Sequence, residues 1–461
     1  MAKSPERSPA TPSGGSDARS HRRVLYSTFL GGVLEWYDFY LYATASAIIF
    51  NVLFFAPGDP VVGTIASFGV LAVGYVARPV GAVIFGHFGD RFGRKNVLIF
   101  TLLAIGSVTV IIGLLPTYAS IGIWAPVLLI VLRIVQGLSA GGEYGGALLM
   151  AVEHTARGRW RGLASSAASA TAPLGAVLAT AALMLVSLLP RDAFLSWGWR
   201  LPFLLSVVMV AVGLWIRLGI RESPVFEQAK SSAQVDRAPF LKVLTAQPAR
   251  LVIGMVLTAA LLVFGVIVYV FGVSYAVQAG FSRSAALAAL MVAQGVQVLL
   301  TPVFAGLSDK VGRRPVLLVG TALQAVLCFG FFAMVDSGST GLLFLAFAVA
   351  TAANSLLSGA VGAVLPELFS VDVRYTGVSV TYAVGSTIGG VGPLVAASLL
   401  AAAGGPPHTL YLSLVMFAVC LIGLAVAAAM RETRGVELSA STGSSGDRVL
   451  SDTSSGDVIR G

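Results

Sequence analysis

Long apolar stretches alternate with short polar breaks along almost the whole chain. Many stretches reach about 20 residues, the length that an α-helix needs to cross about 30 Å of hydrocarbon, and residues 251–277 and 410–430 are two clear examples. No stretch carries the alternating pattern of about ten residues that is typical of membrane β-barrels. The pattern therefore predicts an all-α polytopic membrane protein.

The polar breaks divide the chain into twelve predicted transmembrane helices, in two groups of six. The spans are 24–55, 61–85, 96–116, 121–152, 162–189, 197–219, 250–278, 285–307, 314–335, 341–366, 374–402 and 410–430. The predicted organisation is a disordered tail (1–23), an amino-terminal six-helix bundle (24–220), a central loop (221–249), a carboxyl-terminal six-helix bundle (250–432) and a second disordered tail (433–461). The even division predicts two pseudo-symmetric bundles.

Composition supports a membrane protein and excludes several other classes. Hydrophobic residues make up 56% of the chain and charged residues 11%, against about 25% charged residues in an average soluble domain. The net charge of +9 is spread over loops and tails, so no nucleic-acid partner is expected. Cys328 and Cys420 lie in apolar stretches without CxxC or His-rich neighbours, so neither a disulfide framework nor a metal site is predicted.

The positions of Lys and Arg predict the orientation. Most of them fall in the two tails, the central loop and every second connecting loop, whereas Arg191 and Arg283 lie in loops of the opposite side. Positively charged loops stay in the cytoplasm, which places both termini there. Residues 1–23 lack the apolar segment of a signal peptide. We expect a multi-pass protein of the inner (plasma) membrane, with the lipid bilayer as its surroundings.

A short polar signature occurs in two loops at the same spacing. Between the second and third spans it consists of Gly86, Asp90, Arg91, Gly93, Arg94 and Lys95, and between the eighth and ninth spans of Asp309, Gly312, Arg313 and Arg314, with Ala305 at the first glycine position. One such loop alone could serve only to set the topology. Two loops at corresponding places indicate two related halves.

This duplicated signature resembles the hallmark loop of the major facilitator superfamily. Further segments, Glu35–Phe39, Arg133–Gly137, Trp197–Phe203 and Arg221–Phe226, look like the metabolite:proton symporter family, and within it most like the shikimate transporter group. The resemblance implies secondary transport by alternating access, with the two loops latching the halves on the cytoplasmic side, no cofactor, and function as a monomer.

Few ionisable residues lie within the spans, where each costs at least about 2.5 kcal/mol on insertion scales. Glu35, Asp38 and Tyr42 share one face of the first span, and Tyr42 is placed to hydrogen-bond the Asp38 carboxylate. Arg133 in the fourth span lies at a depth similar to that of Asp38. The two residues form either a central pair in which a carboxylate carries a proton or a permanent ion pair that joins two helices.

Two further groups of polar residues are candidates for substrate binding or coupling. Gln136 and Glu143 share a face of the fourth span, and Glu143 is either a second protonation site or a carboxyl bonded to a neighbouring helix. In the second half the spans hold almost no charge, and the pocket candidates are Tyr269, Gln294, Gln297, Asn354 and Tyr382. These side chains either bind hydroxyls of a substrate or only pack.

Glu153 and Glu367 end the fourth and tenth spans, near Arg157 and Arg374. They are either gate pairs on the cytoplasmic side or exposed ion pairs, which are worth about 0–1 kcal/mol.

These features predict a transporter and not an enzyme. The chain contains no GxxxxGK[ST], HExxH or GxSxG motif. We expect proton-coupled uptake of a small organic acid, such as shikimate or a related hydroxylated or aromatic carboxylate. A proton-antiport exporter of a drug or metabolite, a symporter for a zwitterion such as proline or betaine, and sodium as the coupling ion remain alternatives.

Overall fold

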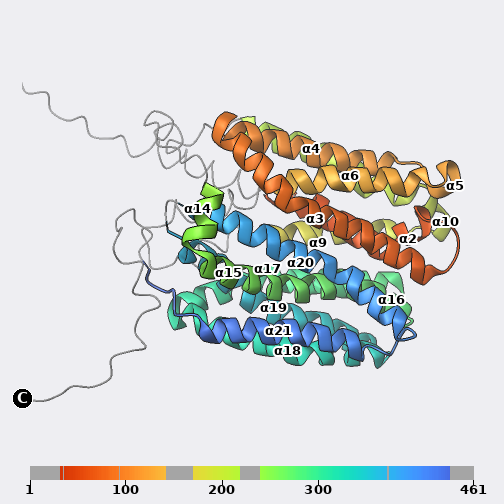
Figure 1. Ribbon diagram of the computed structural model, residues 1–461. Helices are drawn as coiled ribbons and strands as arrows, with labels where there is room; N and C mark the ends of the chain where they lie inside the picture. Colours follow the sequence, from red (N-terminus) through yellow and green to blue (C-terminus); the bar gives the residue numbers. More distant parts are fainter. Residues whose placement is uncertain are drawn as a thin grey trace, which may run out of the picture.

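The computed structural model describes residues 32–34, 36–92, 94–141, 170–218, 239–370 and 373–436 of the chain, and within these ranges every regular element is a helix. Figure 1 shows the helices running roughly parallel in two groups that lie side by side. α14 and the end of α21 lie at one end of the molecule, and α5, α10 and α16 lie at the other. We call these the α14 end and the α16 end.

The amino-terminal group contains the helix of residues 36–48 and the elements that follow it. These are α2 (Phe50–Leu53), α3 (Pro60–Phe92), α4 (Arg94–Leu114), α5 (Tyr118–Ile121), α6 (Trp124–Gly141), α9 (Thr171–Ser187), α10 (Arg191–Ala193), the π-helical turn η1 (Phe194–Gly198), α11 (Arg200–Leu204) and α12 (Ser206–Leu218).

The carboxyl-terminal group begins after the short helix α14 (Pro239–Ala246). It consists of α15 (Pro248–Val266), the π-helical turn η2 (Ile267–Phe271), α16 (Gly272–Gln278), α17 (Arg283–Val311), α18 (Arg313–Asp336), α19 (Thr340–Leu368), α20 (Arg374–Ala402) and α21 (Leu410–Ala429). The helix α14 lies in a stretch predicted only as part of the central loop.

In the carboxyl-terminal group the helices coincide closely with the predicted spans. The predicted span 285–307 is part of α17 (Arg283–Val311), and the predicted span 410–430 is α21. Within the described part of the chain, nine helices are long and apolar enough to cross a membrane, and two shorter apolar helices cover Ile99–Leu114 and Thr171–Ser187. The all-helical fold class is therefore confirmed.

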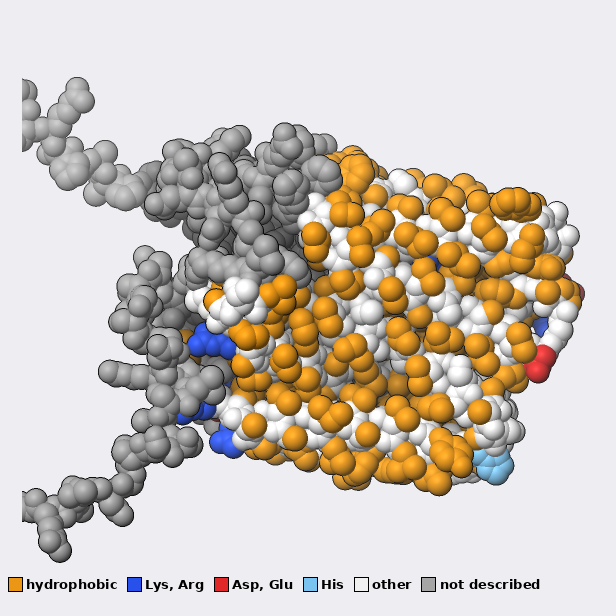
Figure 2. All heavy atoms as spheres, in the orientation of Figure 1, with side chains coloured by type: hydrophobic (Ala, Val, Ile, Leu, Met, Phe, Trp, Pro, Cys, Tyr) orange, Lys and Arg blue, Asp and Glu red, His pale blue; other side chains and the backbone are white. Residues whose placement is uncertain are grey.

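The outer surface is apolar along the sides of the helices. Figure 2 shows hydrophobic side chains spread over the visible side face, with Lys and Arg gathered at the α14 end. Large apolar side chains such as Trp215, Leu299 and Val326 are 78%, 71% and 69% exposed. A surface of this kind is stable in hydrocarbon and not in water, because burying apolar area in lipid removes it from water.

An aromatic cluster fixes the start of the sixth span against α4. Trp199 is fully buried, and its ring packs edge-to-face on Phe54 and Phe203. Arg200 donates hydrogen bonds of 2.8 Å to the carbonyl oxygens of Gly113 and Leu115 at the end of α4. The last carbonyls of a helix have no partner within the helix, so Arg200 closes this end. The charged side chain of Arg200 therefore has a role in holding the structure together.

The two groups of helices meet where α3 packs against α20. The Thr387 hydroxyl of α20 donates a hydrogen bond of 2.9 Å to the Tyr75 carbonyl oxygen of α3. Beside it, a Cβ added to Gly390 would lie 1.9 Å from Cγ of Tyr75. Only a glycine permits this approach. Nearer the α16 end, Phe68 of α3 contacts Phe271, with ring centroids 6.4 Å apart.

Candidate functional site

A cavity lies between the two groups of helices, on the α14 side of the Tyr75–Gly390 contact. The amino-terminal group and α20 both contribute to its walls. The lining residues are Trp36, Phe39, Arg78, Ile105, Gln136, Ala140, Gly141, Ser379, Tyr382, Ala383 and Ser386. Because both halves line the cavity, a movement of one half relative to the other changes the access to it.

Glycines bring α3 and α6 together behind this cavity. A Cβ added to Gly137 would lie 2.0 Å from the Gly74 carbonyl oxygen, and one added to Gly141 would lie 2.0 Å from the Arg78 carbonyl oxygen. Small residues of this kind let transmembrane helices approach closely. Gly137 and Gly141 therefore allow α6 to pack closely on α3.

Arg78 of α3 lines the cavity and is a candidate that the sequence analysis missed. Its side chain is buried, and its Cζ lies 4.2 Å from the centroid of the Phe39 ring and 4.6 Å from that of Tyr75. The buried Nε atom has no hydrogen-bond partner among the described residues. The signal was available, since Arg78 is a charge inside a predicted span.

Arg133 of α6 is fully buried close to Arg78. It donates hydrogen bonds to the Gln136 side-chain oxygen (2.7 Å) and to the Leu71 carbonyl oxygen (3.3 Å). Its Cζ lies 3.9 Å from the centroid of the Tyr42 ring. The guanidinium is therefore held by neutral oxygens and an aromatic face.

Asp38 is buried, and its described partners are hydroxyl groups. Ser206 donates a hydrogen bond of 2.5 Å to Asp38 Oδ1, and the Thr109 hydroxyl is a second neighbour of the carboxylate. The expected direct pair with Arg133 is absent from the described contacts. Instead, Gln136 joins the two residues indirectly, because it accepts from Arg133 and donates to Thr109 Oγ1 over 3.1 Å.

The expected hydrogen bond from Tyr42 to Asp38 is wrong. The Tyr42 hydroxyl has no hydrogen-bond partner among the described residues, and the ring stacks on Arg133. Asp38 and Tyr42 are both buried on the helix of residues 36–48. Which neighbour each side chain meets depends on packing between helices far apart in the sequence.

The five neutral candidates of the second half separate into three places. Asn354 of α19 donates to the Tyr269 hydroxyl (3.1 Å) and accepts from Gln324 (2.9 Å), which forms a buried network across three helices. Tyr382 lines the cavity. Gln294 and Gln297 are buried on α17 and do not line it, and neither the side-chain nitrogen nor the oxygen of Gln294 has a hydrogen-bond partner among the described residues.

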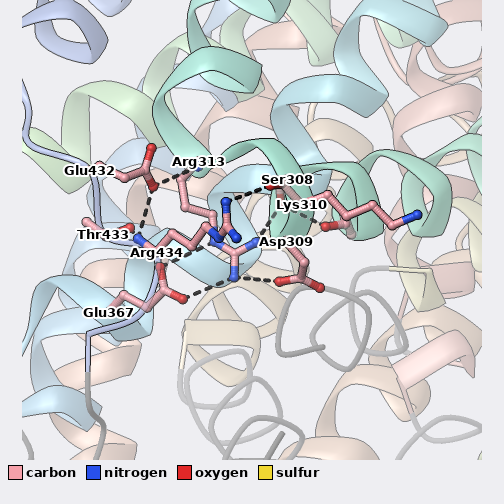
Figure 3. Close-up of polar contacts among 9 residues, drawn as sticks. Ser308, Asp309, Lys310, Arg313, Glu367, Glu432, Thr433 and Arg434 are labelled. Atoms are coloured by element: carbon pink, nitrogen blue, oxygen red, sulfur yellow. Dashed lines mark hydrogen bonds and ion pairs between the residues drawn. The ribbon is translucent and has the colours of Figure 1, made fainter. Parts of the chain in front are cut away.

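The second signature loop forms a buried ionic cluster at the α14 end (Figure 3). Arg313 lies between two carboxylates, with N–O distances of 2.8 Å to Asp309 and 3.2 Å to Glu367, and all three side chains are 2–3% exposed. Arg313 also donates to the Ser308 hydroxyl (2.6 Å). Glu367 thus joins α19 to the junction of α17 and α18.

Gly312 makes the turn between α17 and α18, with a φ of +107° that favours glycine. A Cβ at this position would also lie 2.6 Å from Glu432 Oε2. The glycine of the signature is therefore required by backbone conformation and by this close approach.

Glu432, which follows α21, caps the start of α18. Its two carboxylate oxygens accept hydrogen bonds from the backbone N–H groups of Arg313 (2.8 Å) and Arg314 (3.0 Å). Burial alone raises the pKa of Glu432, but the backbone donors of Arg313, Arg434 and Arg314 and the Arg313 charge outweigh burial and hold the pKa below its ordinary value of 4.5. The negative charge also suits the positive end of the helix dipole.

Two other contacts tie the segment after α21 to the same cluster. The Thr433 hydroxyl donates to Glu367 over 2.7 Å, and Arg434 donates to the Lys310 carbonyl oxygen over 2.6 Å. Thr433 and Arg434, predicted as the start of a disordered tail, are thus in contact with α19 and α17.

Several predicted residues cannot be compared with the structure. Glu35, Gly93, Glu143 and Glu153 lie outside the described residues. For the first signature loop the structure describes only the backbone, in which Gly86, Asp90 and Arg91 belong to α3 and Arg94 and Lys95 begin α4.

Comparison with protein families gives two adjoining matches. The profile described as "Sugar (and other) transporter" matches residues 24–244, and the profile described as "Major Facilitator Superfamily" matches residues 276–451.

Two curated proteins and one solved structure are similar over most of the chain. The shikimate transporter of Escherichia coli (strain K12) is 37% identical over 419 residues, which cover 90% of this chain and 95% of that protein. The inner membrane metabolite transport protein YhjE of the same strain is 40% identical over 388 residues, covering 82% and 88%. The proton:xylose symporter XylE superposes with a TM-score of 0.72 at 17% identity, over 91% of this chain and 98% of XylE, which shows the fold alone.

Proposed function

Since the chain belongs to the major facilitator superfamily, we propose that it takes up a small organic acid together with protons by alternating access. The family and the fold are those of multi-pass membrane transporters and not of enzymes.

The observation that carries proton coupling is the environment of Asp38. A carboxylate buried in the membrane is stable only if it is paired, hydrogen-bonded or protonated. The described contacts of Asp38 are hydroxyl groups, and Ser206 can donate to the ionised form or accept from the protonated one. Asp38 can therefore exist in both states without rearrangement of a counter-ion, which suits a group that takes up and releases a proton.

The proposed substrate class is supported by the similarity to the shikimate transporter and by the lining of the cavity. A cationic guanidinium, aromatic rings and hydroxyl groups line the cavity, through Arg78, Trp36, Phe39, Ser379 and Ser386. These groups complement a small cyclic acid that carries hydroxyls.

The proposed orientation places the α14 end in the cytoplasm, in line with the gathering of Lys and Arg there in Figure 2. The Tyr75–Gly390 contact would then close the pathway on the outer side of the cavity, and the cluster around Arg313 would belong to the inner gate. We propose that a single chain completes this cycle without a cofactor, driven by the proton gradient.

The proton gradient is an adequate source of energy. One pH unit contributes about 1.4 kcal/mol per proton, which is about a tenfold accumulation. One proton carried with one monoanion moves no net charge, so the pH difference alone would drive such a cycle.

Purified protein in liposomes tests the proposal. An acidic exterior with the membrane potential clamped at zero is expected to drive accumulation of labelled shikimate, and a protonophore is expected to abolish it. Asp38→Asn should show no accumulation, because the amide cannot carry the proton. Uptake that ignores the pH difference, or expulsion of the label in exchange for entering protons, would refute symport.

A further inference from the structure

The buried guanidinium of Arg78 is available to a ligand. Its side chain is 7% exposed, it lines the cavity, and no described carboxylate pairs with it. Burying a charge without a partner is costly, so charges retained inside membranes commonly have a task or a partner that comes and goes. A ligand of opposite charge would supply the partner that the described residues do not.

The described contacts of Arg78 leave its Nε–H group without a hydrogen-bond acceptor. Phe39 and Tyr75 lie within 4.6 Å of Cζ, a distance typical of cation–π contacts. The two rings stand at 89° to each other and offer the cation π-electrons, but no carbonyl or carboxylate acceptor for its N–H groups, which lie along the edge of the planar guanidinium. The Nε atom has no partner among the described residues. A planar carboxylate fits this edge with two parallel hydrogen bonds.

The Nε atom of Arg133 also has no hydrogen-bond partner among the described residues, but Arg133 differs from Arg78 at its terminal nitrogens. Hydrogen bonds to Gln136 and Leu71 occupy its two terminal nitrogens, and it does not line the cavity. Its charge lies close enough to that of Arg78 for the two to repel each other. Arg133 therefore adds positive electrostatic potential near the cavity, whereas Arg78 offers the hydrogen-bond donors that face it.

We infer that Arg78 binds the carboxylate of the transported acid, and that the cavity takes monocarboxylates with hydroxyl groups in preference to dicarboxylates. This inference rests on the proposed function and names the group that recognises the substrate. Arg78 is the one charged side chain among the described lining residues. On the opposite wall α20 presents Ser379, Tyr382 and Ser386, which suit hydroxyls and would leave a second carboxylate without a cation.

Direct binding to the purified protein, without any gradient, tests this inference. Calorimetric titration compares shikimate, its uncharged methyl ester and a ketodicarboxylate on wild type, Arg78→Gln and Arg78→Lys. Arg78→Gln is expected to weaken shikimate binding about 10- to 100-fold, the usual effect of losing hydrogen bonds to a charged group. The affinity of Arg78→Lys for shikimate should lie between those of wild type and Arg78→Gln, because lysine keeps the charge and lacks the planar guanidinium that donates two parallel hydrogen bonds.

The matched control is Arg283→Gln. Arg283 is also stacked on an aromatic ring, with Cζ 5.0 Å from the Phe194 centroid, and its buried Nε also has no partner among the described residues, but it lies outside the cavity. We expect it to leave shikimate binding unchanged. The methyl ester should bind wild type and Arg78→Gln equally, which a collapsed cavity would not allow.

The outcomes separate this inference from the proposed function. Three results would overturn the inference and leave proton coupling untouched: wild-type affinity for shikimate in Arg78→Gln, an equal loss of affinity for the acid and the ester in that variant, or wild-type protein that binds the ketodicarboxylate as tightly as shikimate. Binding that depends on Arg78 in a protein that shows no proton-driven uptake would support the inference and overturn the symport proposal.

Discussion

Ser206 donates a hydrogen bond of 2.5 Å to the carboxylate of Asp38, across 168 positions of sequence. The bond joins the helix of residues 36–48 to α12, and both side chains are buried. This hydrogen bond therefore links the first and sixth spans at the carboxyl group to which we assign proton coupling.

Ser206→Ala is expected to slow proton-driven accumulation about tenfold. A hydrogen bond to a charged group contributes about 1.5–3 kcal/mol, so its loss makes the ionised form of Asp38 harder to reach. Exchange of labelled for unlabelled substrate at equal pH needs no net proton release and should continue. The two activities are measured on the same liposomes.

Ser139→Ala is the control for this change. The Ser139 hydroxyl is buried on α6 but donates to the Val135 carbonyl oxygen of its own helix. Accumulation should therefore stay near the wild-type value. If Ser206→Ala slows exchange as much as accumulation, the bond serves packing and not proton release.

Gly390→Ala is expected to reduce transport at least tenfold. The added Cβ would lie 1.9 Å from Cγ of Tyr75, and real atoms do not approach so closely, so α3 and α20 must separate. We expect the closed state on the α16 side of the cavity to be lost. Uptake and thermal unfolding in detergent are the measurements.

Gly295→Ala provides the comparison for Gly390→Ala. A Cβ at Gly295 meets nothing within 4 Å, and alanine favours a helix by about 1 kcal/mol over glycine. This variant should transport normally. Wild-type transport by Gly390→Ala would show that the close contact is not part of the cycle.

The carboxyl-terminal helices were predictable from the sequence because their spans hold almost no charge and each is a nearly continuous apolar stretch. The predicted span 314–335 and the observed α18 (Arg313–Asp336) differ by one residue at each end. The separate helix α14 was not predicted. Its eight residues are too short a segment for a hydrophobic run to indicate a span.

The partners of the candidate residues were harder to predict than their positions. Asp38 and Arg133 are both buried as expected, but the charges do not pair directly, because Gln136 and Thr109 lie between them. Ser206 gave no sequence signal, since a serine in an apolar span is common. Depth follows from counting residues, whereas contacts follow from how separate helices pack.

Arg313→Gln is expected to destabilise the protein by about 3–5 kcal/mol, the usual cost of leaving buried charges without their partner. Asp309 and Glu367 would lose the cation that lies between them at 2.8 and 3.2 Å. Thermal unfolding in detergent measures the effect. Arg314→Gln, at the neighbouring exposed position, should cost less than about 1 kcal/mol. Equal costs for the two variants would contradict a buried ionic cluster.

Glu432→Gln is expected to lower the thermal stability at neutral pH by about 1 kcal/mol, as the loss of a helix cap does. The pKa of Glu432 is held below 4.5 in the folded protein, so the unfolded chain binds the proton more tightly. The stability that the carboxylate contributes is therefore complete above 4.5 and is lost as the pH falls through the lowered folded value.

The difference in melting temperature between wild type and Glu432→Gln should consequently shrink as the pH falls below 4.5, because protonated Glu432 and glutamine have similar hydrogen-bonding ability. Arg434→Gln serves as the reference, since it removes the contact with the Lys310 carbonyl oxygen but no acid. Its offset from wild type should not depend on pH in this range. A Glu432→Gln offset that stays constant from neutral to acidic pH would show that the charge of the carboxylate does not stabilise the start of α18, and that the segment after α21 is held by Thr433 and Arg434 instead.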